Sequence, residues 1–279
     1  MNLFDIKGKK AIVTGGSRGL GYGMAEGLME AGCETVIIGV SDRVFRTAQE
    51  FRERGLSCQA VRADLGDREE MEPCFKKAVE LLGGRLDILV TAHGIQSRHR
   101  SEEFPLEDWS RVLDVNLTAV FMLCQMAARQ FMEQGEGGKI ITVSSMLSFF
   151  GGFTVPAYAA SKGGVAQLTK ALCNEWAGKG ITVNSLAPGY MATDMNEALL
   201  DPENPRNAEI TGRIPAGRWG TGEDMKGPVI FLASRASDYL NGAVIPVDGG
   251  VSGTLTARRD VTLKESSIVP EKKDGRNRA

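Results

Sequence analysis

Lys10-Ala11-Ile12-Val13-Thr14-Gly15-Gly16-Ser17-Arg18-Gly19-Leu20-Gly21 is the stretch that decides the fold of this chain. Its first half is a short apolar, β-branched run typical of a buried strand, and the apolar residues after Gly21 have helical spacing. Glycines between a strand and a helix let backbone amides and the helix N-terminus approach a pyrophosphate. The glycine spacing alone is also compatible with a flexible turn. In this context it predicts a nucleotide-binding turn, with contacts at Gly15, Ser17, Arg18, Gly19, Leu20 and Gly21.

Strand-like runs alternate with helical patterns along the rest of the chain. Strands are expected at 35–40, 58–62, 86–90, 139–143, 181–186 and 243–247, and helices at 44–54, 68–82, 156–179 and 225–232. This alternation predicts an α/β fold, a single-domain Rossmann-type doubly wound parallel sheet with helices on both faces. We expect the domain to occupy 1–253, with 190–218 as a lid of short helices over the site, and 254–279 to be a charged tail.

Asn116 lies inside an otherwise helical pattern that begins near Pro105. Asparagine is a poor helix former because its side chain can bond to nearby backbone groups or to water. We therefore expect the helix to be kinked or interrupted at Asn116.

Composition limits the class of protein. The 279 residues are 42% apolar, and 33 basic against 35 acidic residues give a formal charge of −2. These values are ordinary for a soluble globular protein and give no reason to expect a nucleic acid or a membrane as partner. The polar N-terminus does not resemble a signal peptide, and no apolar run approaches the length of a membrane span, so we expect a cytoplasmic protein. Five cysteines without a Cys-x-x-Cys pair predict reduced thiols and no metal site.

The loop after the second predicted strand should meet the adenosine ribose of a dinucleotide. Here the sequence is ambiguous. Asp42 can accept a hydrogen bond from a ribose 2′-hydroxyl, which favours NAD, whereas Arg43 together with Arg18 can hold a 2′-phosphate, which favours NADP. Each of these charges can equally be a solvated loop residue.

Two further predicted strands end in candidate contacts for a nucleotide. Asp64-Leu65 follows the third strand and Gly94 follows the fourth. Asp64 can accept a hydrogen bond from an adenine amino group. Capping of the next helix by Asp64 or Asp67 is the competing explanation.

Tyr158 and Lys162 lie four residues apart in the helix predicted from Pro156, so their side chains share a helix face. A free phenol has a pKa of about 10, but an adjacent ammonium and a cationic cofactor would lower it. The same spacing also fits a surface tyrosine and a solvated lysine. The carboxyl ends of parallel strands meet at one edge of a sheet, which brings this pair beside the glycine turn. We therefore predict a proton-transfer pair.

These residues together resemble the short-chain dehydrogenase/reductase family, over essentially residues 5 to 255. The matching pieces are Thr14-Gly15-x-x-x-Gly19-x-Gly21, Asp64, Asn116, Ser145, Tyr158-x-x-x-Lys162 and Pro188-Gly189. The resemblance implies an NAD- or NADP-dependent oxidoreductase, with a slight preference for NAD. Tyr158 would donate or accept the proton, and Lys162 would lower its pKa and hold the nicotinamide ribose. Ser145 would bond the reacting oxygen, and Asn116 would support a water relay. Further implied coenzyme contacts are Pro188, Gly189, Met191 and Thr193.

Ser144 and Ser145 can both supply a hydroxyl. We choose Ser145 because the family's serine usually stands thirteen residues before the tyrosine.

A narrower likeness concerns the sugar-acid branch of the family, the 2-dehydro-3-deoxy-D-gluconate 5-dehydrogenases with the related 2-deoxygluconate 3-dehydrogenases and gluconate 5-dehydrogenases. It is carried by residues 145–152, Asn174-Glu175-Trp176, residues 187–193 and residues 213–220. It implies a small substrate with a carboxylate, which Arg98 or His99 can bind because a guanidinium suits a carboxylate. A solvated Arg98 and an idle His99 remain the alternative. The family also implies a homotetramer.

The chain departs from the family where Thr91-Ala92-His93-Gly94 replaces the usual Asn-Asn-Ala-Gly, and in its long charged tail. Other functions stay open: a reductase of acyl-carrier thioesters, steroids or neutral polyols, or an NAD(P)-binding sensor without turnover.

Overall fold

A seven-stranded parallel sheet forms the centre of the molecule. The computed structural model describes residues 2–254. Its strands are β1 (Lys10–Thr14), β2 (Glu34–Gly39), β3 (Cys58–Arg62), β4 (Ile88–Thr91), β5 (Gly138–Val143), β6 (Ile181–Pro188) and β7 (Val244–Val247). They lie in the order β3-β2-β1-β4-β5-β6-β7. The order reverses direction between β1 and β4, which is where ligands bind in open α/β sheets. The predicted doubly wound parallel fold is confirmed.

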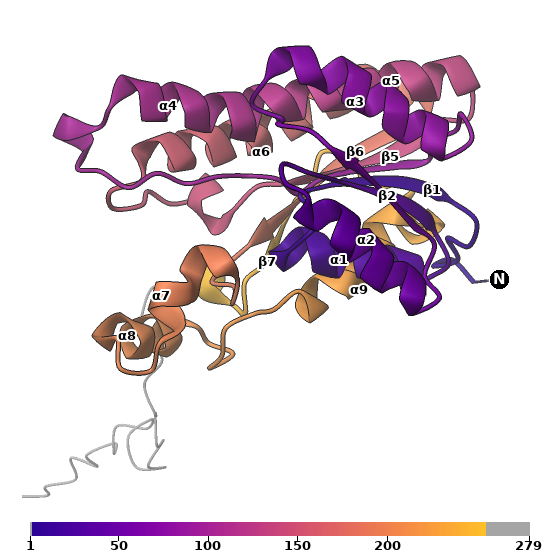
Figure 1. Ribbon diagram of the computed structural model, residues 1–279. Coiled ribbons are helices and arrows are strands. Elements are labelled where there is room, and N and C mark those ends of the chain that lie inside the picture. The colour runs from indigo at the N-terminus through magenta and orange to yellow at the C-terminus, as the bar shows by residue number, and fades with distance from the viewer. Residues whose placement is uncertain (1, 255–279) are drawn as a thin grey trace, which may run out of the picture.

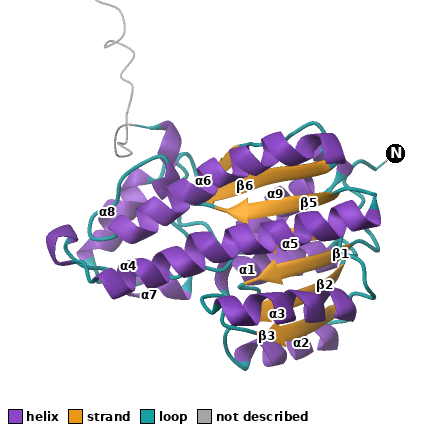
Figure 2. Cartoon of the chain, turned by 90° about the horizontal axis from the view of Figure 1, so that it is seen from above, coloured by secondary structure: helices purple, strands orange, loops and turns teal. Residues whose placement is uncertain are grey.

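Helices cover both faces of the sheet (Figures 1 and 2). The upper layer in Figure 1 contains α3 (Arg68–Leu81), α4 (Leu106–Leu113), α5 (Ala119–Gln134) and α6 (Pro156–Trp176). The lower layer contains α1 (Gly19–Glu30), α2 (Arg43–Glu53) and α9 (Glu223–Ala233). Each layer shares its own apolar core with the sheet, since the buried strand residues alternate between the two core clusters.

The predicted interruption at Asn116 is confirmed. A π-helical turn, Asp114–Thr118, joins α4 to α5, and the Ala119 amide donates to the Asp114 carbonyl five residues back. The resulting helical run, Leu106–Gln134, is long and apolar enough to cross a membrane by length and composition, contrary to the expectation from sequence. Half of its most apolar window is buried inside the fold, where α5 packs against the sheet. A core helix accounts for this composition.

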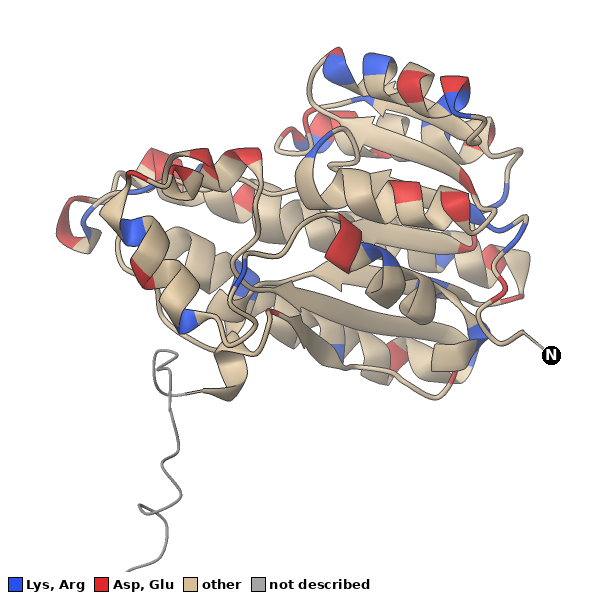
Figure 3. Cartoon of the chain, turned by 90° about the horizontal axis from the view of Figure 1, so that it is seen from below, with Lys and Arg blue, Asp and Glu red and all other residues tan. Residues whose placement is uncertain are grey.

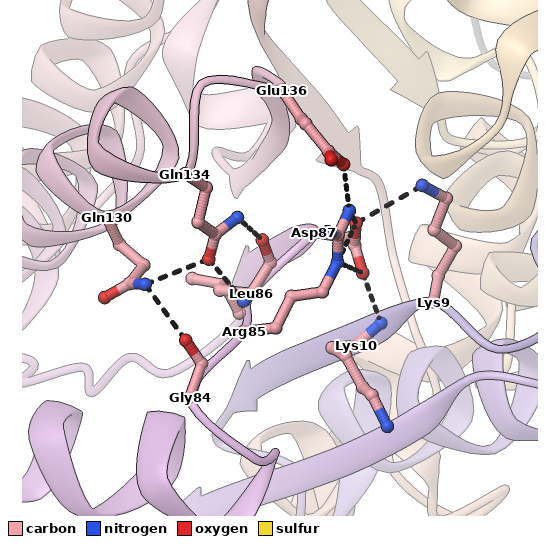
Figure 4. A network of polar contacts seen from close by, with 9 residues as sticks. All are labelled: Lys9, Lys10, Gly84, Arg85, Leu86, Asp87, Gln130, Gln134 and Glu136. Atoms are coloured by element: carbon pink, nitrogen blue, oxygen red, sulfur yellow. Dashed lines mark hydrogen bonds and ion pairs between the residues drawn. The ribbon is translucent and has the colours of Figure 1, made fainter.

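The edge of the sheet where the strands begin is held by a polar network around Asp87 (Figure 4). The Asp87 carboxylate accepts from the Lys10 backbone amide at 2.9 Å and from the Arg85 guanidinium at 2.7 Å. Gln134 at the end of α5 bonds both the amide and the carbonyl of Leu86. These contacts fix the starts of β1 and β4 to the end of α5, at the edge opposite to the site described below.

The lower helix layer carries a second charged cluster. Glu26 in α1 is buried, and its carboxylate pairs with Arg54 after α2 and at 2.7 Å with Lys226 in α9. Figure 3 views the molecule from this side and shows basic and acidic residues close together on its helices. The pairs tie the three helices of this layer together.

Beyond β6 the chain leaves the sheet and forms short helices. They are a 3₁₀ turn at Asp194–Asn196, α7 (Glu197–Leu200) and α8 (Pro205–Arg213), and Figure 1 shows α7 and α8 projecting below the end of the sheet. They lie within the stretch 190–218 for which short helices are predicted. Of the predicted charged tail, only Thr254 falls within the described residues.

Candidate active site

Four neighbouring strands bring the candidate residues to one edge of the sheet. β1 ends before Gly15, β4 before Gly94, β5 before Ser145, and β6 at Pro188. These strands are adjacent in the order β1-β4-β5-β6 and all parallel, so their carboxyl ends lie side by side. The edge includes the point where the strand order reverses, which is the expected place for a ligand.

The turn between β1 and α1 requires glycine at particular positions. Gly15 and Gly19 have φ angles of +67° and +56°, in the left-handed region. A Cβ on Gly21 would lie 2.2 Å from the Gly15 carbonyl oxygen, so α1 approaches the turn too closely for any side chain there. The first turn of α1 contains no acidic residue. The result is a cradle of main-chain atoms at a helix N-terminus, which fits an anionic pyrophosphate.

Other predicted contacts line this cradle. The Ser17 carbonyl accepts from the Thr47 hydroxyl at 3.3 Å, which fixes the turn to α2. Leu20 is half-buried and packs against the core of the lower layer. Thr193, from the chain after β6, would lie 3.4 Å from a Cβ on Gly19. The segment after β6 therefore reaches the glycine turn.

The candidate residues of the ribose loop have different ionic partners. Arg18 and Arg43 lie together, and each donates an Nη1 to the same carboxylate oxygen of Asp194, at 3.2 and 3.4 Å. Asp42 is instead paired with Arg62 at 2.9 Å. The arginine pair proposed for a 2′-phosphate thus exists in space, although sequence gave no sign of its partner Asp194, which lies 151 or more residues further along the chain.

Asp64 is not the cap of α3. The Asp67 side chain caps that helix by accepting from the Glu69 amide, whereas Asp64 accepts from the Gly66 amide at 2.8 Å and from Arg111 of α4 at 2.7 Å. The bonds from Gly66 and Arg111 outweigh partial burial and lower the pKa of the Asp64 carboxyl. Leu65 is buried in the upper core.

Tyr158 and Lys162 lie at the start of α6, beside the end of β5. The Lys162 Nζ donates to the Val143 carbonyl at 2.8 Å and lies 5.8 Å from the centre of the Tyr158 ring. Burial lowers the pKa of Lys162 to about 8, so the ammonium still predominates at neutral pH. A Cβ on Gly94, after β4, would lie 3.5 Å from the Lys162 Nζ. The side chains share one helix face and lie at the same sheet edge as the glycine turn.

The pKa of Tyr158 differs from the expectation that its neighbours lower it. Burial raises the pKa of the phenol, and the hydrogen bond with Ser145 opposes this rise only in part. The nearby ammonium does not reverse the shift because Lys162 is directed to the Val143 carbonyl. Within the protein alone the phenol is therefore protonated at neutral pH.

Ser144 and Ser145 occupy different surroundings. The Ser144 hydroxyl donates to the Leu186 carbonyl at 3.2 Å and accepts from the Ser185 hydroxyl at 2.8 Å, both on β6. The Ser145 hydroxyl lies near enough to the Tyr158 phenol to lower its pKa and accepts from the Leu147 amide at 3.1 Å. Only Ser145 faces the phenol.

Asn116 is fully buried in the π-helical turn. Its amide group exchanges two hydrogen bonds of 2.9 Å with the backbone of Ile95 and donates to the Ser161 hydroxyl at 3.1 Å. Its Oδ1 lies 3.3 Å from where a Cβ of Gly94 would be. Asn116 thereby joins the loop after β4 to α6, beside Lys162.

His93 fills the place where the resembled family usually has a methyl group. It is buried, its Nε2 lies 3.0 Å from the Val115 carbonyl, and its Nδ1 lies 2.6 Å from the Thr14 hydroxyl. A carbonyl only accepts, so the proton is on Nε2 and the Thr14 hydroxyl donates to Nδ1. Burial and the nearby Lys162 lower the pKa of His93 to about 3. A neutral imidazole therefore links β1 to the π-helical turn.

The segment after β6 is fixed at its base. Met191 is buried and forms an isolated bridge with Gly220, and the Ala192 amide donates to the Gly220 carbonyl at 2.7 Å. A Cβ on Gly189 would lie 2.6 Å from the Asp248 Cβ. Residues 190–218 therefore leave and rejoin the fold at neighbouring points, as a lid requires.

Of the two residues proposed to bind a substrate carboxylate, one already has a carboxylate partner in the described part of the chain and the other does not. His99 Nε2 lies 2.6 Å from the Asp108 carboxylate, which also accepts from the Ser97 hydroxyl at 2.6 Å. Arg98 is exposed and has no ion pair among the described residues. Only Arg98 is thus available to a second carboxylate without breaking an existing contact.

The fold and this site define a dinucleotide-binding oxidoreductase in which a phenol and an ammonium stand beside a glycine cradle. Comparison with known proteins agrees with this class. The chain matches the short chain dehydrogenase family over residues 9–204 and belongs to that family. It is an NAD(P)-dependent enzyme.

Individual relatives are also similar over most of their length. The chain is 46% identical over 250 residues to a 2-dehydro-3-deoxy-D-gluconate 5-dehydrogenase of Dickeya dadantii (strain 3937), covering 90% of this chain and 98% of that protein. It is 38% identical over 255 residues to a gluconate 5-dehydrogenase of Gluconobacter oxydans (strain 621H), covering 91% and 98%. The solved structure of a gluconate 5-dehydrogenase from Burkholderia cenocepacia J2315, in complex with NADP and tartrate, has a TM-score of 0.86 at 38% identity and covers 91% of this chain and 99% of that one.

Proposed function

We propose that the enzyme interconverts a secondary alcohol and a ketone on a small sugar acid of the gluconate or deoxy-keto-gluconate type. The observation that carries the chemistry is the meeting of Ser145, Tyr158 and Lys162 beside the glycine cradle. The sugar-acid substrate is supported by the names of the relatives, which act on gluconate and its keto and deoxy derivatives.

The residues at the sheet edge fit a nicotinamide dinucleotide, because the positive φ of Gly15 and Gly19 and the close approach of Gly21 to Gly15 leave main-chain atoms at the N-terminus of α1. Amides of the turn at 15–21 would hold the pyrophosphate, and Lys162 would hold the nicotinamide ribose. When bound, the nicotinamide accepts or supplies the hydride. The other proposed contacts are Asp64, Leu65, Gly94, Pro188, Gly189, Met191 and Thr193. The coenzyme is NAD or NADP, and the convergence of Arg18 and Arg43 on Asp194 supports NADP.

Tyr158 is the proposed acid and base. In alcohol oxidation its phenolate takes the hydroxyl proton, and in ketone reduction its phenol returns that proton to the oxygen. The hydrogen bond with Ser145 favours the phenolate, against the burial that disfavours it. The proposed role of Lys162 is to add the field of its ammonium to this effect when the coenzyme is bound. Ser145 is placed to bond the reacting oxygen as well. Asn116 holds the turn next to Lys162, and its proposed role in a water relay is consistent with its contact with Ser161.

We propose that Arg98, rather than His99, binds the substrate carboxylate. His99 is already paired with the Asp108 carboxylate, whereas the planar Arg98 guanidinium is free to bind a carboxylate through two parallel hydrogen bonds. Lid residues 190–218 would exclude water from the reacting atoms.

A panel of hexonates and deoxy-keto-hexonates, assayed with NAD and NADP, tests the function. We expect turnover of at least one sugar acid, and Tyr158→Phe should lower kcat by orders of magnitude while coenzyme binding persists. Near-normal turnover by Tyr158→Phe would refute the assigned role. Activity on neutral alcohols, steroids or acyl thioesters alone would remove the sugar-acid proposal, and coenzyme binding without any turnover would favour a sensor.

We also propose a cytoplasmic homotetramer. Leu106 on α4 and Phe121 and Met132 on α5 are exposed apolar side chains, and their exposure supports burial of this layer in an assembly. Sedimentation velocity measures the number of subunits, and a monomer would overturn this proposal.

A further inference from the structure

Asp194 joins the lid to the arginine pair of the ribose loop. It begins the 3₁₀ turn Asp194–Asn196, and its Oδ2 accepts from Arg18 at 3.2 Å and from Arg43 at 3.4 Å. Arg18 precedes α1 and Arg43 begins α2, so three separate segments meet at one oxygen atom. All three side chains are about half exposed.

The arginines have no other described partner that could take the place of this carboxylate. Among residues 2–254, Arg18 and Arg43 form ion pairs only with Asp194, and the neighbouring Asp42 is paired with Arg62. Two guanidinium groups that converge on one point repel each other unless an anion lies between them. Asp194 is that anion in this structure.

A 2′-phosphate would need the same position. Guanidinium groups bind phosphate in the geometry in which they bind carboxylate, and a phosphate offers more charge and more acceptor oxygens. The Asp194 carboxylate and a 2′-phosphate cannot both lie between the two arginines without like-charge repulsion.

Because Asp194 lies in the lid, competition between its carboxylate and a 2′-phosphate also affects the lid. Thr193 packs against the glycine turn, and the Asn196 side chain donates to the Met191 carbonyl at 2.9 Å, so the carboxylate is carried on the ordered first turn of the lid. Displacing the carboxylate removes both ion pairs that hold that turn to the ribose loop.

We propose that Asp194 is an internal counter-ion that competes with the 2′-phosphate of NADP, so that it lowers the affinity for NADP relative to NAD and is released from the ribose loop only by the phosphorylated coenzyme. This inference rests on the proposed coenzyme site at the glycine turn. It assigns a specificity-determining role to a residue of the lid.

Binding of two nucleotide fragments tests the competition without turnover. Adenosine 2′,5′-bisphosphate and ADP are titrated calorimetrically into the wild-type enzyme, Asp194→Asn and Asp201→Asn. Asp201 is the matched control, since it lies in the same lid and has no ion pair among the described residues. We expect Asp194→Asn to tighten binding of the bisphosphate about three- to tenfold, the range for two exposed ion pairs, to leave ADP unchanged, and to lose this effect in about 0.5 M salt.

Limited trypsin digestion supplies a second readout. The bisphosphate should speed cleavage at Arg206 and Arg213 in the wild-type lid about twofold, because it releases the first turn, whereas ADP should not. Asp194→Asn should be cleaved at the faster rate without any ligand.

Failure of the Asp194 proposal and failure of the coenzyme site give different results. Equal or weaker bisphosphate binding by Asp194→Asn, or the same gain in Asp201→Asn, overturns the role of Asp194 while leaving the coenzyme site intact. If neither fragment binds the wild-type enzyme, the coenzyme site itself is refuted and this inference with it.

Discussion

Replacement of His93 by alanine should destabilise the enzyme at neutral pH and have little effect in acid. The imidazole donates from Nε2 to the Val115 carbonyl and accepts at Nδ1 from the Thr14 hydroxyl, and only 8% of the residue is exposed. Alanine removes both contacts and leaves a small cavity between β1 and the π-helical turn.

The cost at neutral pH follows from these contacts. The buried Val115 carbonyl loses its donor, while the Thr14 hydroxyl can still reach the Val90 carbonyl at 3.4 Å. An unpaired buried acceptor costs about 1–3 kcal/mol, and the cavity adds to it, so we expect a loss of about 3 kcal/mol in the free energy of unfolding.

Acid removes the stabilising contribution of His93. Its pKa is lowered from 6.5 to about 3 in the folded protein, chiefly by burial. Below pH 6.5 the unfolded chain therefore binds a proton that the folded chain does not, and stability falls as the pH falls toward 3. Between about pH 7.5 and pH 4.5 this loss is about 3 kcal/mol. The alanine variant lacks it, so the difference between the two proteins should shrink to nearly zero at pH 4.5.

Urea unfolding monitored by tryptophan fluorescence, at one protein concentration and several pH values, measures this difference. Groups other than His93 titrate in both proteins and cancel in the comparison. Thr14→Ser is the control, since it keeps the hydroxyl and should retain the pH dependence of the wild type. A His93→Ala cost that is the same at pH 7.5 and pH 4.5 would refute the buried, neutral imidazole.

Three other substitutions test the fold around the site. Gly21→Ala should abolish coenzyme binding, measured by calorimetry, because its Cβ would lie 2.2 Å from the Gly15 carbonyl oxygen; undiminished binding would refute the cradle. Asp87→Asn should lower the free energy of unfolding by about 2–4 kcal/mol at pH 7. Since the pKa of the Asp87 carboxyl is lowered from 3.8, chiefly by the Arg85 hydrogen bond against the effect of burial, this difference should narrow as the pH falls below 3.8. Asn116→Ala should lower kcat more than coenzyme affinity, since it frees the loop at Ile95 beside Lys162; unchanged kinetics would contradict this positioning role.

Local sequence patterns predicted most of the fold. The strand at 58–62 and the start of α6 at Pro156 have the expected bounds, because apolar strands and a proline in the first helical turn leave little choice. The interruption at Asn116 was predictable from the chemistry of asparagine. The form of this interruption, a π-helical turn that continues α4 into α5, was not predicted, since such a turn has no simple sequence pattern.

Long-range ionic partners could not be predicted. Asp194 meets Arg18 from 176 residues away, and Arg111 meets Asp64 from 47 residues away, and neither pairing leaves a periodic signal in the sequence. The rise in the pKa of Tyr158 in the protein without coenzyme could not be predicted, because the spacing of Tyr158 and Lys162 shows a shared helix face but not how deeply both side chains are buried. The sequence shows that His93 departs from the family pattern, but its hydrogen bonds to Thr14 and Val115 could not be predicted from it.

The π-helical turn at Asp114–Thr118 constrains how this enzyme can change in evolution. An α-helix turns about 100° per residue, so the extra residue in the turn offsets the contact stripe of α4 from that of α5 by that angle. Deleting one residue would restore regular α-helix and swing either Asn116 away from Ile95 or the whole of α4 around its axis. We therefore expect insertions and deletions among its homologues to be tolerated in surface loops but to be missing from this five-residue window.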